Sequence, residues 1–96
     1  MTEQWHSLSI LFEPGMEPFQ RHDIEDELEA ALGDLGETTG GGTAVDLSFS
    51  DISLEVTDVN AGIKIIREVL QRLEVPKTTK ITQHCEPEPI EYKVYE

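Results

Sequence analysis

The chain is short and strongly acidic. Its 96 residues are enough for one domain with a single hydrophobic core and too few for two. With 20 acidic and 7 basic residues the formal net charge is -13, which disfavours direct binding of nucleic acid or an anionic membrane, because phosphate contacts need clustered Lys and Arg. The sequence shows neither a signal-peptide pattern nor an apolar run that could span a bilayer, so a cytoplasmic location is expected.

The first predicted element is a strand over residues 5–13. Leu8, Ile10 and Phe12 share one phase of an alternating pattern, which is typical of a strand with one buried face. Trp5 has the opposite phase and is expected on the open face of a sheet, where a partner could contact it.

A helix is predicted to begin near Pro18 and to end at Gly33 or Gly36, since glycine commonly follows the last helical turn. Apolar residues recur inside it at helical spacing. They are Ile24, Leu28, Ala31, Leu32 and Leu35. The other face of this helix is almost entirely acidic, and its like charges four residues apart repel one another by a few tenths of a kcal/mol.

A hairpin is expected next. Apolar residues alternate in one phase over 45–49 and in the other over 52–56, so a turn or bulge is predicted at Ser50 and Asp51. The Gly40–Gly42 run leads into the first hairpin strand, which we expect to be irregular and at a sheet edge, where glycine is best tolerated.

A second helix is predicted between a cap at Asp58 or Asn60 and an end marked by Pro76. Its apolar stripe consists of Val59, Ile63, Ile66, Leu70 and Leu73. Its outer face carries Lys64, Glu68 and Arg72, whose spacing suits opposite-charge pairs on a solvated surface.

The C-terminal part is expected to add a strand over residues 80–84. Residues 86–96 then form either a further short strand, within 90–95, or an ordered tail of the same single domain.

The order strand, helix, hairpin, helix, strand resembles the ferredoxin-like βαββαβ arrangement over most of the chain. The resemblance implies an α+β two-layer sandwich, with an antiparallel sheet and two helices on one face. It is a likeness of architecture alone. Because this fold hosts metabolic regulators, RNA readers, metal chaperones and protein inhibitors, it assigns no function by itself.

Sequence motifs for chemistry are weak. Asp46, Asp51, Glu55 and Asp58 lack the spacing of a calcium loop, so neither a metal nor a cofactor is expected. The Gly40–Gly42 run could cradle an anion through its backbone, but no Lys follows it and acids surround it, so an edge or hairpin loop is the favoured reading.

His84 and Cys85 do not resemble a catalytic pair either. Neighbouring residues on a strand point to opposite faces, and Cys85 has no second cysteine with which to form a metal site or an internal disulfide. The chain also lacks a serine elbow, a phosphate-binding loop and the aromatic-basic pattern of RNA-reading domains. A non-enzymatic role is therefore expected.

The uneven distribution of charge is the most informative feature. Residues up to Asp58 contain 14 acids and a single base, Arg21, whereas the remaining residues contain six of each. In size and charge the chain resembles small acidic inhibitors of nucleases, including immunity proteins of bacterial toxin systems. We therefore expect an immunity or inhibitor protein whose acidic part binds and neutralises a basic effector such as a nuclease toxin. The expected partner-binding residues are Asp23, Asp26, Glu27, Glu29 and Asp46.

Three other interpretations stay open. The acids could serve solubility alone. The chain could be a small-ligand regulatory domain, acting as a dimer with the glycine run at a pocket between two copies. An enzyme is the third, and would need distant carboxylates brought together in a cleft. Both a monomer and a homodimer fit the sequence.

Overall fold

The computed structural model describes residues 5–13, 18–43, 49–85 and 87–95. Within these residues the chain forms one antiparallel sheet of five strands, two α-helices and a short 3-10 helix. In chain order they are β1 (His6–Phe12), α1 (Pro18–Leu32), η1 (Gly33–Leu35), β2 (Gly36–Thr43), β3 (Ser50–Val56), α2 (Val59–Arg72), β4 (Lys80–Gln83) and β5 (Ile90–Lys93).

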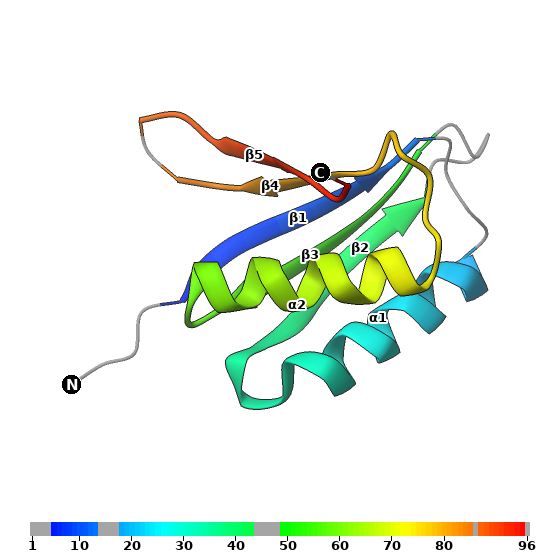
Figure 1. Cartoon of the computed structure of the whole chain (residues 1–96), viewed down its shortest axis with the longest axis horizontal. Helices are drawn as coiled ribbons and strands as arrows, with labels where there is room; N and C mark the ends of the chain where they lie inside the picture. The colour runs from blue at the N-terminus through cyan, green and yellow to red at the C-terminus, as the bar shows by residue number, and fades with distance from the viewer. Residues whose placement is uncertain (1–4, 14–17, 44–48, 86, 96) are drawn as a thin grey trace.

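The strand order in the sheet is β2-β3-β1-β4-β5, and every neighbouring pair is antiparallel. Helices α1 and α2 lie side by side on one face of the sheet, as Figure 1 shows. The first four strands in this order have the arrangement of a ferredoxin-like sandwich, and β5 extends it beyond β4. The predicted α+β class and two-layer architecture are therefore confirmed.

The core lies between the sheet and the two helices. Leu8, Ile10 and Phe12 of the central strand are at most 1% exposed, as the alternation in their segment predicts. They pack in one cluster with Leu28 of α1 and Ile66 of α2, both of which are fully buried. Burying an apolar side chain of this size stabilises the fold by about 1.5–3 kcal/mol, so this layer fixes where both helices sit.

The helix ends follow their local chemistry. Helix α1 stops at Leu32 because Gly33 adopts a φ of +55°, a left-handed conformation that glycine accepts at little cost. The side chain of Asp58 caps α2 by accepting a hydrogen bond from Ala61 N at 3.0 Å. Leu73, predicted to close the apolar stripe, is instead 39% exposed, because α2 ends at Arg72.

The turn or bulge predicted at Ser50 and Asp51 is wrong. Both residues belong to β3, and Ser50 is fully buried in the same inward phase as Ile52. The outer hairpin strand is the glycine-rich segment Gly36–Thr43 itself, which occupies the sheet edge with a bulge between Thr38 and Gly40. Residues 44–48, which contain most of the strand predicted over 44–49, lie outside the described residues.

The C-terminal segment forms a strand rather than a tail without secondary structure. β5 pairs with β4, and side chains from α2 bind its backbone: Arg67 Nε donates to Lys93 O at 2.7 Å and Gln71 Nε2 donates to Val94 O at 2.6 Å. Tyr95 adds a third bond, from its hydroxyl to Val75 O at 2.6 Å. These contacts attach β5 and the two residues after it to α2 and to the segment that follows α2.

No helix in the described part of the chain has both the length and the apolar character needed to cross a membrane.

Candidate functional site

The outer side of α1 carries four of the five residues predicted to bind a partner. Asp23, Asp26, Glu27 and Glu29 are all exposed. Helical geometry orients them, because the buried stripe of Ile24, Leu28 and Leu32 faces the sheet and leaves the other positions toward solvent. The fifth predicted residue, Asp46, lies outside the described residues.

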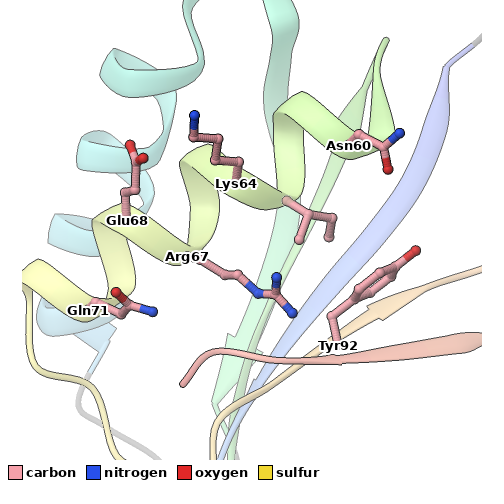
Figure 2. Close-up of a pocket in the computed structure, with 7 residues that line it drawn as sticks. Asn60, Lys64, Arg67, Glu68, Gln71 and Tyr92 are labelled. Atoms are coloured by element: carbon pink, nitrogen blue, oxygen red, sulfur yellow. The ribbon is translucent and has the colours of Figure 1, made fainter. Parts of the chain in front are cut away.

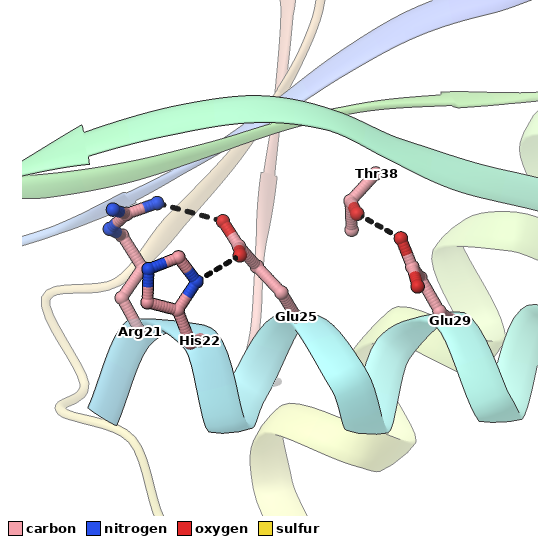
Figure 3. Close-up of polar contacts among 5 residues, drawn as sticks. All are labelled: Arg21, His22, Glu25, Glu29 and Thr38. Carbon is pink, nitrogen blue, oxygen red and sulfur yellow. Dashed lines mark hydrogen bonds and ion pairs between the residues drawn. The ribbon is translucent and has the colours of Figure 1, made fainter. Parts of the chain in front are cut away.

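Two of the α1 carboxylates are neutralised locally. Glu25 forms an ion pair with Arg21 at 2.8 Å and a hydrogen bond with His22 at 3.0 Å, as Figure 3 shows. Glu27 forms its ion pair with a different element, at 2.7 Å from Arg72 of α2. These carboxylates therefore contribute less to the external field than their number suggests.

The remaining acids on α1 have no cationic partner within the described residues. Glu29 accepts a hydrogen bond from the hydroxyl of Thr38 on β2, which orients the carboxylate without cancelling its charge (Figure 3). Asp23 and Asp26 form no ion pair with any described side chain. We call Asp23, Asp26 and Glu29 the acidic face; it is held on a helix whose opposite side is buried in the core.

The contact between α1 and β2 depends on Arg21 and Gly41. The Arg21 side chain is only 12% exposed, and its Nη1 atom lies 2.8 Å from where a Cβ at Gly41 would stand. The backbone oxygen of Asp51 would be closer still, at 2.5 Å. Glycine at this position therefore gives the Arg21–Glu25 pair its space between helix and strand.

Sequence reasoning did not assign Arg21 a place. The signal was present, because Arg21 is the single base among the first 58 residues and lies four positions before Glu25. No local pattern links the glycine run to the acidic helix, and the structure brings the two into contact. Arg21 Nε is also buried with no hydrogen-bond partner among the described residues.

The open face of the sheet beside β2 is acidic as well. Glu37 of β2 stands opposite Glu55 of β3 in the register, and Asp51 lies further along β3 in the same phase. Like charges in direct register are destabilising, and neither glutamate forms an ion pair within the described residues. Carboxylates thus lie on both sides of the β2 edge, from α1 on one face and from the sheet on the other.

A groove between α2 and β5 has a different character. It encloses about 280 Å³ and is lined by Asn60, Ile63, Lys64, Arg67, Glu68, Gln71 and Tyr92. Figure 2 shows the Arg67 side chain extending from α2 toward β5, where the Tyr92 ring projects from the strand. Two bases and one acid line the groove, so its local charge is opposite to that of the molecule as a whole.

The histidines and the cysteine form no combined site among the described residues. His84 Nε2 lies 2.8 Å from Ser9 Oγ, while Cys85 Sγ donates to Glu88 O at 3.4 Å. Where side chains are described, no group of three or more His, Cys, Asp or Glu residues has the geometry of a metal site.

Comparisons with known proteins identify the fold and nothing beyond it. No model of a known protein family matches the chain, and no curated protein sequence does. The structure is similar to the crystal structure of PH0061, with a TM-score of 0.51 and 16% sequence identity over 92% of this chain. The match spans 57% of that longer chain, and at this identity it supports the ferredoxin-like architecture alone.

Proposed function

We propose that this protein is a non-enzymatic binding module whose acidic face docks on a basic protein. The observation that carries the proposal is the set of three exposed carboxylates on α1, Asp23, Asp26 and Glu29, which have no cationic partner within the described residues. Acidic residues can keep a protein soluble wherever they lie on the surface. A docking surface, in contrast, gains specificity when its carboxylates are held at fixed positions by a packed helix.

The physical effect of this face is mainly on encounter and orientation. A net charge of -13 attracts a cationic partner over distances of about one Debye length, roughly 10 Å at 0.1 M salt. Close contact then replaces water around Asp23, Asp26 and Glu29 with Lys or Arg side chains of the partner. Association should therefore be fast at low salt and should weaken steeply as salt is added.

The specific form of the proposal is an inhibitor or immunity protein for a basic effector such as a nuclease toxin. A nuclease presents a cationic cleft to phosphates, and a helix with carboxylates along one side matches such a cleft in charge. Support for this form comes from size and charge distribution, which the small acidic inhibitors share.

The test is capture from a lysate of the source organism with three tagged proteins. They are the wild type, the acidic-face variant Asp23→Asn/Asp26→Asn/Glu29→Gln, and the matched control Glu74→Gln/Glu88→Gln/Glu91→Gln. Both variants lose three negative charges, but the control removes them from positions that do not belong to α1. We expect the wild type and the control to retain one basic partner that a high-salt wash releases, and the acidic-face variant to lose it. Equal retention by all three would refute the assignment of this face.

The groove between α2 and β5 favours a second candidate, a small-ligand domain. Lys64 and Arg67 would attract an anionic group, while Ile63 and Tyr92 offer apolar contact to the rest of a small molecule. The test is an NMR titration with benzoate, with neutral benzamide as the control. Shifts at Ile63 and Tyr92 with benzoate alone would support this candidate, and identical responses to the two compounds would refute it.

A further inference from the structure

The two outer strands of the sheet differ in how their edges are protected. β5 has four residues, is preceded by Pro87 and Pro89, and carries charged residues of both signs. Short length, proline and charge are the usual means by which an edge strand avoids pairing with another chain. β5 therefore has a protected edge.

β2 is twice as long and has little of this protection. Its eight residues contain no proline, and Glu37 is its one charged residue. Gly40 and Gly41 are exposed and have no side chain that could shield the backbone. The bulge at Thr39 is the one interruption of the β2–β3 register, and it is the main feature that would disturb pairing at this edge. Among the described residues β2 pairs with β3 alone, on one of its two sides.

The charge around this edge decides what could occupy it. Glu29 of α1 lies on one side of β2, bonded to Thr38, and the Glu37–Glu55 pair lies on the other. Pairing of two copies through β2 would bring both acidic sets together, in chains that each carry a charge of -13. A strand bearing Lys or Arg side chains would instead meet carboxylates on both faces.

We infer that the outer edge of β2 adds an extended basic segment of the partner protein to the sheet. The inference rests on the proposed function, because that function supplies the basic partner, and it specifies how the partner binds. Backbone hydrogen bonds along β2 would supply affinity, and successive basic side chains, which point to opposite faces of the added strand, would reach Glu29 on one face and Glu37 on the other. The glycines allow close approach of the incoming backbone.

The experiment uses a defined probe, the peptide acetyl-Val-Lys-Lys-Val-Lys-Lys-Val-amide, which as an extended strand presents two lysines on each face. Its control is the peptoid with the same side chains, which keeps the charge but has no backbone N–H except at its amidated end. At low salt we expect the peptide to bind the intact protein at least about tenfold more tightly than the peptoid, since backbone bonds are lost in the latter. Hydrogen exchange should slow in β2 and stay unchanged in β5.

A variant of the protein gives a second reading. Thr39 is skipped in the β2–β3 register, so Thr39→Pro should keep that pairing while placing a ring at the edge. We expect Thr39→Pro to weaken peptide binding by about tenfold and to leave peptoid binding unchanged, with Thr39→Val as the control.

Three outcomes would overturn the inference, and they are distinguishable. Equal binding of peptide and peptoid, lost in the acidic-face variant, would leave the proposed function standing and exclude strand addition. Binding of neither probe would contradict both the inference and the charge attraction on which the proposed function depends. A dimer in light scattering, with slow exchange in β2 before any peptide is added, would show that a second copy occupies the edge.

Discussion

The Arg21 guanidinium and the backbone of Asp51 together leave no room for a side chain at position 41. A Cβ there would lie 2.5 Å from Asp51 O and 2.8 Å from Arg21 Nη1. We predict that Gly41→Ala destabilises the fold by about 1–3 kcal/mol, because either the backbone or the partly buried Arg21–Glu25 pair must shift. The measurement is urea unfolding. Gly40→Ala is the matched control, since nothing lies within 4 Å of its Cβ position, and an equal loss in both variants would contradict this account.

The cap of α2 gives a second prediction at the residue scale. Asp58 accepts a hydrogen bond from Ala61 N, so Asp58→Ala should lower the free energy of unfolding by about 1 kcal/mol. Asp58→Asn should retain most of the stability that the cap provides, because Asn is also a good N-cap residue. Thermal unfolding of the wild type and the two variants checks this, and an Asp58→Ala variant as stable as the wild type would mean that the cap contributes nothing.

At the scale of elements, β5 depends on α2 for its attachment. Gln71 donates to Val94 O, directly after the four residues of this short edge strand. We predict that Gln71→Ala speeds amide exchange of β5 by about tenfold, corresponding to about one hydrogen bond. Exchange in β1 should not change. Uniform acceleration over the whole sheet would indicate global destabilisation instead.

The elements also show how far the sequence alone could lead. Strong periodicity predicted β1, α1 and α2 with few errors, because one buried face imposes a regular pattern on each. The sequence did not predict that Gly36–Thr43 is a strand, because glycine has low strand propensity. This strand is stabilised by its pairing with β3, which no local sequence pattern reveals. The sequence predicts that α1 carries exposed acids. It does not show that Glu27 forms an ion pair with Arg72, because that pair depends on the contact between the two helices.

At the scale of the whole molecule, the charge should oppose folding at low salt. The radius of gyration is 12.7 Å, so the acids repel one another across the molecule when the Debye length is about 30 Å, at 0.01 M salt. We predict that raising the salt to 0.1 M increases Tm by several degrees, since relief of about 1 kcal/mol corresponds to about 4–8 °C in a domain of this size. Calorimetry measures this. The acidic-face variant should respond less, and an unchanged Tm in the wild type would argue against self-repulsion.

The most direct test of the central claim, that the acidic face binds a basic protein, is the affinity of the captured partner for three proteins across a salt series. They are the wild type, the acidic-face variant and the control with three neutralised glutamates elsewhere. We predict that Kd rises at least about tenfold in the acidic-face variant at low salt and much less in the control, with the difference shrinking as salt is added. If both variants bind as the wild type does, or if both weaken equally, Asp23, Asp26 and Glu29 form no specific binding surface.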